Sequence, residues 1–374
     1  MLIDDELASI DKRLPISEKL NAIHKEIKRH APFVDRIAIA IYDEESDLLK
    51  TFIASSDNPS TLRYYQSPLK QSASLVELVD SGKSRVINDL SVFSEVDKQH
   101  RKSIDKEGYT SSYTCPIYNN EVFTGFIFIN SREKNVFTPS VLSELSPFAH
   151  LISLITAKEL DLVNVLLGSV CTALDISHHR DPETGAHLER MSRYSRLIAL
   201  ELAPTHQLDD EYIEYLYRFA PLHDVGKIAI PDNILLKPGR LTDEEFEIMK
   251  SHSSKGRDMI DRMLNNFKLT EMKHTDMLRN IIEHHHETLD GQGYPNQLQA
   301  ENIPLEARIT TVADIFDALT SQRPYKKAWS NDEAFAELTS MTQSKLDKVC
   351  VDALIKRRVD VEQIQKQFED DYFG

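Results

Sequence analysis

Hydrophobic and polar positions alternate in the first third of the chain as they do in strands. Residues 36–43, RIAIAIYD, predict one strand, and residues 48–55, LLKTFIAS, predict its partner. Residues 111–131 predict two further strands around an Asn-Asn-Glu turn, the pattern of a hairpin. Residues 74–90 predict a helix, a glycine turn and a short strand. We therefore expect residues 1–137 to form an α/β domain, an antiparallel sheet with helices.

The pattern changes at Thr138, where apolar residues begin to recur at helical spacing. They lie near a heptad seam that Glu159 interrupts. A helix packed into a core and a signalling helix that joins two domains and helps the protein to dimerise both fit this pattern. We assign residues 138–160 to a long linker helix. Residues 161–374 are mostly helical and predict an all-α domain, in which Thr242 and Glu245 form a capping-box pair.

Length and charge narrow the class of protein. A chain of 374 residues is long for one core and indicates two domains. The formal net charge of −16 argues against general DNA or RNA binding, although one cationic pocket for a small anion is compatible with it. The three cysteines lie far apart, which fits a reducing cytoplasm. The acidic N-terminus does not resemble a signal peptide, and apolar stretches reach only about 13 residues, so we expect a soluble cytoplasmic protein.

The spacing of histidines and carboxylates carries the chemistry. Eleven of the fourteen histidines lie at or after residue 150, and three of them, residues 284–286, are consecutive. Glu183 and His187 are four residues apart, so on a helix both can reach one ion. His223 and Asp224 are adjacent; on a helix their side chains diverge, so they can serve two neighbouring metals or the carboxylate can bridge them. A lone histidine is usually structural, but this spacing predicts a metal centre.

The donor types predict the kind of metal centre. His252 and the three consecutive histidines add imidazoles, and Asp314 and Asp317 lie on one face of a predicted helix. Imidazole and carboxylate donors without thiolates favour iron, manganese or zinc. Their number exceeds the needs of one tetrahedral zinc, so we expect two or three divalent metals. Clusters of this kind clamp phosphoryl oxygens during in-line displacement.

Three long motifs resemble the HD-GYP family of the HD superfamily of metal-dependent phosphohydrolases. They are HDVGKIAIPDNILLKPGRLTDEEFEIMKSH, HHETLDGQGYP and IPLEARITTVADIFDALTSQRPYKK, and the match covers roughly residues 170–330. The resemblance implies an enzyme, a phosphodiesterase that hydrolyses a bacterial cyclic dinucleotide, chiefly cyclic di-GMP. The order of strands and helix in the first domain resembles a GAF-type sensor domain over about 130 residues.

The resemblance also implies a ligand set. The family's metal ligands fall on Glu183, His187, His223, Asp224, His252, His285, His286 and Asp314. The offset from Asp-Gly-x-Gly-Tyr-Pro selects His285 and His286, which leaves His284 in a supporting or structural role. Where the family has a carboxylate at the position of Glu183, a third metal is implied. Iron and manganese are the metals that the family implies.

The resemblance and the local chemistry together suggest how a substrate is held. Asp224 would bridge metals, and Lys227 would neutralise charge that develops on the phosphate. Tyr294, on a glycine-rich loop, would stack on a base or bond a phosphate. Arg323 and Lys326 suit phosphate clamping, and Asp317 would accept a bond from a base edge or orient a ligand. An ordinary solvated surface remains the alternative for Arg323, Lys326 and Asp317.

The expected reaction is attack on phosphorus by a metal-bound hydroxide, which gives a linear dinucleotide or mononucleotides. One alternative is a catalytically weak sensor that binds a cyclic dinucleotide and signals through partners. Another is an HD hydrolase of a different nucleotide, and the choice between cyclic di-GMP and 3′,3′-cyclic GMP-AMP stays open. We expect the first domain to regulate the second, and a homodimer to form through the linker helix or the GAF-like domain.

Overall fold

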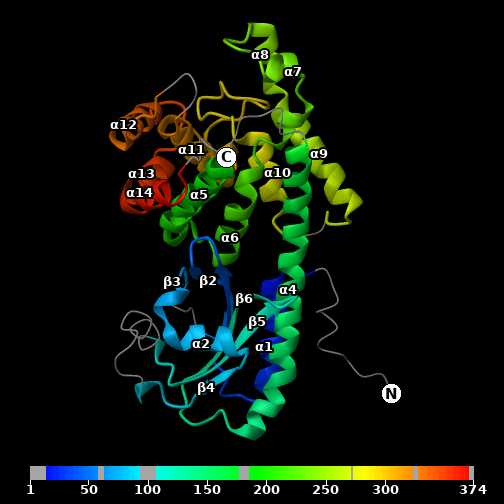
Figure 1. Ribbon diagram of the computed structural model, residues 1–374, viewed down its shortest axis with the longest axis vertical. Helices are drawn as coiled ribbons and strands as arrows, with labels where there is room; N and C mark the ends of the chain where they lie inside the picture. Colours follow the sequence, from blue (N-terminus) through cyan, green and yellow to red (C-terminus); the bar gives the residue numbers. More distant parts are fainter. Residues whose placement is uncertain are drawn as a thin grey trace. The chain divides into compact units, whose positions relative to one another are not determined.

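The computed structural model describes residues 14–57, 63–92, 107–176, 185–270, 273–322 and 327–369. The chain divides into two compact units, residues 1–164 and 165–374. Helix α4 (Pro139–Ile176) is one continuous helix that includes the residues on both sides of this division (Figure 1). The predicted linker at 138–160 is therefore part of a longer helix, and the predicted functional domain limits stay predictions.

The N-terminal unit is an antiparallel sheet with helices, as predicted. Its six strands have the order β3-β2-β1-β6-β5-β4, and each neighbouring pair is antiparallel. Strands β5 and β6 form the predicted hairpin around residues 119–122. Besides α4, the elements are α1 (Ile16–His30), β1 (Arg36–Asp43), β2 (Leu48–Ser56), β3 (Gln66–Pro68), η2 (Leu69–Gln71), α2 (Ala73–Ser81), β4 (Arg85–Ile87), η3 (Leu90–Val92), β5 (Ser111–Asn119) and β6 (Val122–Ser131).

Strand β1 lies in the middle of the sheet and is buried on both faces. Its isoleucines point to one face and its alanines to the other, because side chains alternate along a strand. Ser55 is paired with Ile37 and bonds His24 of α1 at 2.7 Å, so α1 covers the isoleucine face. Helix α2 covers the other face (Figure 1).

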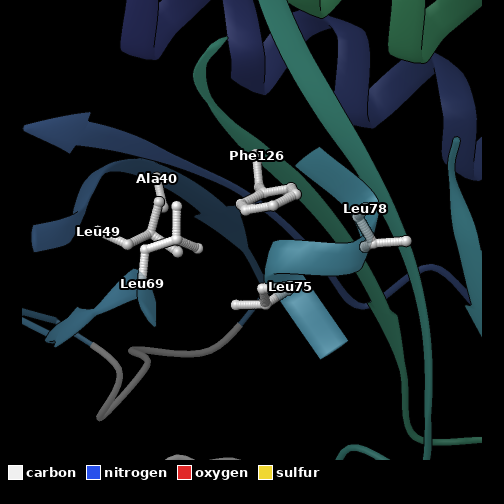
Figure 2. Packing of buried hydrophobic residues seen from close by; sticks show 6 residues of the cluster. All are labelled: Ala40, Leu49, Leu69, Leu75, Leu78 and Phe126. Carbon is white, nitrogen blue, oxygen red and sulfur yellow. The ribbon is translucent and has the colours of Figure 1, made fainter. Parts of the chain in front are cut away.

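The alanine face carries the core cluster between the sheet and α2. Ala40 and Phe126 are paired across β1 and β6, and the small alanine leaves room for the ring (Figure 2). Burying a leucine or phenylalanine side chain stabilises a fold by roughly 1.5–3 kcal/mol. The cluster consists of Ala40, Leu49, Leu69, Leu75, Leu78 and Phe126.

The C-terminal unit is helical, as predicted. Its described residues contribute no strand, only an isolated bridge between Asp290 and Gln299. None of the helices described is both long and apolar enough to cross a membrane. The elements are α5 (Gly185–His206), α6 (Asp210–Phe219), η4 (Ala220–Leu222), η5 (Val225–Ala229), α7 (Asp232–Leu235), α8 (Asp243–Lys250), α9 (His252–Asn266), α10 (Thr275–His284), η6 (Ala300–Asn302), α11 (Leu305–Thr320), α12 (Asn331–Met341), α13 (Lys348–Lys356) and α14 (Arg358–Gln367).

Helix α5 is the centre of this unit. It packs against α6, α11, α13 and α14, and therefore buries residues on most of its circumference. Some of those buried residues are polar, among them His187 and Arg190. The predicted capping box begins α8: Thr242 accepts from the backbone of Glu245, whose side chain accepts from the backbone of Thr242. The polar residues buried near the start of α5 indicate that a functional site lies around this end of the helix.

Candidate metal centre

His223 and Asp224 lie in a sharp junction between two short 3-10 helices, η4 and η5. The sequence pattern suggested an α-helix here, and that expectation is wrong. The two side chains do not diverge as adjacent helical positions would, because Nε2 of His223 lies 3.1 Å from Oδ2 of Asp224. His223 is fully buried, and its Nδ1 lies 3.0 Å from the carbonyl oxygen of Ala220.

A glycine brings this junction against α9. A Cβ on Gly226 would lie 1.9 Å from the carbonyl oxygen of His252 and 2.6 Å from the backbone nitrogen of Gly256. Real Cβ atoms do not approach so closely, so only glycine permits this contact. The close approach places Nε2 of His252 3.1 Å from Oδ1 of Asp224.

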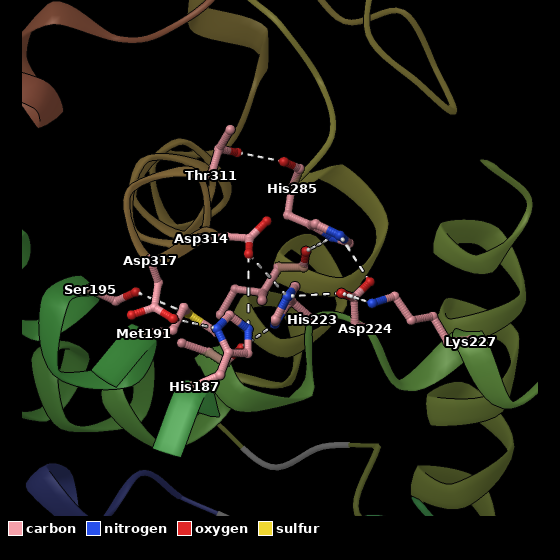
Figure 3. A network of polar contacts seen from close by, with 12 residues as sticks. His187, Met191, Ser195, His223, Asp224, Lys227, His285, Thr311, Asp314 and Asp317 are labelled. Carbon is pink, nitrogen blue, oxygen red and sulfur yellow. Dashed lines mark hydrogen bonds and ion pairs between the residues drawn. The ribbon is translucent and has the colours of Figure 1, made fainter. Parts of the chain in front are cut away.

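His285 and His286 lie just beyond the end of α10, which ends at His284. Thr311 of α11 donates a hydrogen bond of 2.6 Å to the carbonyl oxygen of His285 (Figure 3). Glu287 is buried and its two oxygens accept from the backbone N–H groups of Asn296 and Leu298, at 2.6 and 3.0 Å. These bonds hold the glycine-rich loop against the end of α10.

The side chains from these elements gather in two groups of candidate ligands. Within each group, one ligand atom per residue lies within 4.8 Å of all the others. The groups bring together seven of the eight predicted metal ligands, and the eighth, Glu183, lies outside the described residues. One group is Asp224, His252, His285 and His286, and the other is His187, His223 and Asp314.

The carboxylate of Asp224 lies between the two groups. Its Oδ1 faces His252 at 3.1 Å and His285 at 3.6 Å, while its Oδ2 faces His223 of the other group at 3.1 Å. In the second group, Oδ1 of Asp314 lies 4.0 Å from Nε2 of His187 and 3.9 Å from Nε2 of His223. Two ligands that each lie about 2.1 Å from one ion are at most about 4.2 Å apart, so these distances suit shared metals.

The imidazoles present the nitrogen that a metal requires. Nδ1 of His252 lies 2.8 Å from the carbonyl oxygen of Met249, and Nδ1 of His285 lies 3.1 Å from that of Ile281. A carbonyl oxygen only accepts, so each Nδ1 carries the proton and each neutral ring has a lone pair on Nε2. The two Nε2 atoms face each other at 3.5 Å. Two lone pairs at this distance repel unless a cation lies between them, so the residues fit a bound metal.

The charge states fit the same conclusion. Burial lowers the pKa of His285 and lowers that of His286 further, so both rings are neutral at neutral pH. Burial opposes ionisation of Asp224, but Lys227 and His223 hold its pKa well below the ordinary value. Metal ligands must be deprotonated, and these residues already are.

Asp317 contacts His187, a member of the second ligand group. Its side chain is fully buried, and Oδ2 accepts from Nδ1 of His187 at 2.8 Å (Figure 3). Two nitrogens of Arg190 also donate to the carboxylate, at 2.7 and 3.0 Å. Oδ1 accepts one of these bonds and Oδ2 the other two, and the side chain has no exposed surface. Of the two predicted roles, contact with a base edge or orientation of a ligand, these contacts favour the second. The carboxylate orients the imidazole of His187. Arg190, one turn after His187, was missed because the sequence does not reveal its partner.

The remaining predicted substrate contacts border the two groups or lie outside the described residues. Nζ of Lys227 is 2.9 Å from Oδ2 of Asp224. The ring of Tyr294 lies over that of His286, with 4.7 Å between centroids, and burial raises the pKa of its hydroxyl. Arg323 and Lys326 are among the residues that the structure does not describe.

Two neighbours of Tyr294 were not predicted. Phe246 of α8 is 47% exposed, and its ring centroid lies 6.4 Å from that of Tyr294. Nζ of Lys250 lies 5.8 Å from the Tyr294 ring and 5.5 Å from the Phe246 ring. The spacing of Phe246 and Lys250 on one helical face was the available signal, but only the fold brings that face to Tyr294.

Known proteins are similar to parts of each of the two units of the chain. Residues 182–349 match the HD domain family, so the C-terminal region contains an HD domain. A cyclic di-GMP phosphodiesterase response regulator of Xanthomonas campestris, RpfG, is 46% identical over 190 residues, which are 51% of this chain and 47% of that protein. A cyclic di-GMP phosphodiesterase of Vibrio cholerae is 40% identical over 216 residues, 54% of this chain and 44% of that protein.

A 3′3′-cGAMP-specific phosphodiesterase of Vibrio cholerae is also similar, with 37% identity over 177 residues, 47% of this chain and 32% of that protein. The chain spans about half the length, or less, of these curated relatives. Similar solved structures include the GAF domain of an Acinetobacter phosphoenolpyruvate-protein phosphotransferase, at 13% identity and a TM-score of 0.34. That match covers 42% of this chain and 92% of that domain. The fold of the N-terminal unit is therefore described by its own strand order and not by this similarity.

Proposed function

We propose that the chain is a metal-dependent phosphodiesterase that hydrolyses a bacterial cyclic dinucleotide, cyclic di-GMP or 3′,3′-cyclic GMP-AMP. The observation that carries the proposal is the carboxylate of Asp224, with one oxygen toward each of two ligand groups. A carboxylate in this position is suited to bridging two metals, as phosphodiester hydrolysis by two-metal sites requires. The names of the similar proteins support the same reaction.

The ligands that the structure describes would hold two metals, and Glu183 would help to hold a third. His252, His285 and His286 would hold one ion, His187, His223 and Asp314 another, with Asp224 between them. The set contains only nitrogen and oxygen donors, which favour iron, manganese or zinc. Of these metals, the family resemblance implies iron or manganese. Bound metals would supply Lewis acidity and an activated water.

The protein's own residues would position the phosphate and balance its charge. Lys227, beside Asp224, would donate to a phosphate oxygen and stabilise the charge that develops there. Tyr294 would present its ring or hydroxyl from the loop that Glu287 holds. From the sequence, Arg323 and Lys326 remain our candidates for a second phosphate clamp.

The surroundings of Tyr294 suggest where a base lies. Phe246 exposes an aromatic ring, and Lys250 adds a positive charge above both rings. Stacking on an aromatic ring suits any nucleobase, and the cation suits the neighbouring phosphate. This part of the site would therefore bind the substrate without choosing between guanine and adenine.

One experiment tests the function and the substrate together. The protein would be purified with Fe²⁺ or Mn²⁺, its metal content measured by elemental analysis, and both cyclic dinucleotides assayed on the same sample. We expect at least two metal equivalents and turnover of at least one substrate. If the protein binds metal and a cyclic dinucleotide but shows no turnover, the result favours the sensor. If it binds neither dinucleotide, both the phosphodiesterase and the sensor are excluded.

The rest of the chain would serve regulation. We assign residues 1–137 to a GAF-like regulatory domain, 138–160 to a linker and 161–374 to the hydrolase domain. We also propose a cytoplasmic homodimer that binds neither nucleic acid polymers nor membranes, with contacts through α4 or the N-terminal domain. Light scattering during size-exclusion chromatography would test the dimer, because a monomeric mass at micromolar concentration contradicts it.

A further inference from the structure

The support of His187 extends through the buried side chains of Asp317 and Arg190 to Phe368, which follows α14. Asp317 accepts from Nδ1 of His187, and Arg190 binds the same carboxylate through Nε and Nη2. Ser321 completes this arrangement, since its hydroxyl donates to Asp317 at 2.9 Å and accepts from Arg190 at 2.8 Å. Asp317 is 0% and Arg190 4% exposed, so solvent does not replace these bonds.

A further bond of Arg190 reaches the segment that follows α14. Its Nη1 donates to the carbonyl oxygen of Phe368 at 2.8 Å. The ring of Phe368 in turn lies under the guanidinium of Arg193, with 4.3 Å from Cζ to the ring centroid. Two arginines of α5, one turn apart, therefore hold Phe368 in place.

We propose that Phe368 is a latch that couples the metal affinity of the His187 group to the seating of the C-terminal segment. When Phe368 is seated, Arg190 is held from both sides, by Phe368 and by Asp317, and it fixes the carboxylate that orients His187. When Phe368 leaves, Nη1 of Arg190 loses the carbonyl oxygen of Phe368, which weakens the hold on the guanidinium and favours its rotation away from Asp317. His187 then loses its orientation, while His252 and His285 of the other group keep their own backbone supports.

The coupling is reciprocal because binding free energies are linked. A metal bound to His187 favours the arrangement in which Asp317 and Arg190 are fixed. The same metal therefore stabilises the seated state of Phe368. Any partner or modification that displaces the segment after α14 would lower metal occupancy at one group and leave the other loaded. The inference rests on the proposed function only in requiring that the His187 group binds a metal.

A matched pair of truncations tests the latch. One chain ends after Glu369 and keeps Phe368, and the other ends after Gln367 and lacks it. Both would be titrated with Mn²⁺ against a chelator, with elemental analysis of the bound ion. We expect the shorter chain to bind one metal equivalent roughly 10-fold more weakly. Losses of this size are common when a residue that supports a metal ligand is removed. The affinities for the other metal equivalents should not change.

Variants of Arg190 and Phe368 separate this coupling from general destabilisation. Arg190→Gln should lower the affinity for the same metal equivalent. Removing Phe368 from the Arg190→Gln variant should lower that affinity no further, because the coupling to Phe368 runs through Arg190. Phe368→Ala keeps the carbonyl but loses the ring, and should give a smaller loss. In the intact chain, adding Mn²⁺ should slow hydrogen exchange at residues 361–369, and Arg190→Gln should abolish that effect.

The outcomes distinguish the two proposals. Equal metal affinities of the two truncated chains would overturn the latch and leave the phosphodiesterase proposal intact. Additive losses in Arg190→Gln and the truncation would also overturn it, since they indicate two independent effects. If the intact chain folds but binds no metal at all, the proposed function fails first and the latch fails with it.

Discussion

Gly226 and Gly256 meet across the contact between η5 and α9 with no room for a side chain on Gly226. A Cβ there would lie 2.6 Å from the nitrogen of Gly256 and 1.9 Å from the carbonyl oxygen of His252. The pair thus fixes the distance between Asp224 and His252, which come from opposite sides of this contact.

Gly226→Ala should separate η5 from α9. The added methyl meets backbone rather than a flexible side chain, so we expect a loss of roughly 1–3 kcal/mol in the free energy of unfolding, together with loss of bound metal. Denaturant unfolding and elemental analysis would measure both. Gly168→Ala in α4 is the control, because a Cβ there meets nothing within 4 Å. A metal content equal to that of the unsubstituted protein would contradict the role given to Gly226.

The three consecutive histidines should differ in their effect on metal binding. His285 and His286 belong to a ligand group and His284 to neither group of the described residues. His284→Ala should therefore keep most of the bound metal, whereas His285→Ala or His286→Ala should lose metal and activity. Elemental analysis of the three variants is the measurement. Equal losses in all three would show that the register of the ligands is wrong.

Lys227→Met should lower turnover and keep the metals. The substitution removes the ammonium 2.9 Å from Asp224 but no metal ligand. Loss of one group that stabilises developing charge commonly costs about 10²–10³-fold in kcat. Steady-state kinetics and metal analysis would be run beside Lys356→Ala, a change in an exposed pair. If kcat is unchanged, or falls only in proportion to lost metal, Lys227 is not a substrate contact.

Glu287→Gln should loosen the loop that carries Tyr294. An amide offers one acceptor oxygen where the carboxylate offers two, so one of the N–H groups of Asn296 and Leu298 loses its partner. We expect faster hydrogen exchange in residues 291–298 and a KM several-fold higher, with metal content preserved. Glu301→Gln, on an exposed 3-10 turn, is the matched control. Unchanged exchange in this loop would contradict the role given to Glu287.

The N-terminal unit should lose stability as the pH falls below about 6.5. Burial lowers the pKa of His24, so the unfolded chain binds its proton at a higher pH than the folded unit does. Stability is therefore complete above the unfolded pKa and falls toward the lowered folded value, by at most about 1.4 kcal/mol per pH unit. Hydrogen exchange of β1 and β2 amides, compared between pH 7.5 and 5.5, measures this dependence.

His24→Gln is the control for that pH dependence. Glutamine offers a donor and an acceptor in place of the ring nitrogens that face Val34 and Ser55, but it does not titrate. The variant should be less stable at pH 7.5 and should lose less stability on acidification. An equal loss in both proteins would assign the pH dependence to other groups.

Local patterns predicted those parts of the fold that depend on local physics. The alternation in residues 36–43 predicted β1, and the Thr242–Glu245 pair predicted the start of α8, because both signals act over a few residues. The ligand types were predictable in the same way. The role of Asp317 was left open between a base edge and orientation of a ligand, since its partner Arg190 is 127 residues away and packing decides which contact forms. The contact that Gly226 permits with α9 could not be predicted either, because it depends on how the two elements pack.

The supports of the imidazoles divide the centre into a fixed part and an adjustable part. His223, His252 and His285 are oriented by main-chain carbonyls, which every amino acid supplies. Their basicity is therefore insensitive to substitution at the supporting position. His187 is oriented by a side chain, so one codon change at Asp317 alters its donor strength. Evolution or a designer can tune the electron density of this centre at His187 far more readily than at its other supported imidazoles.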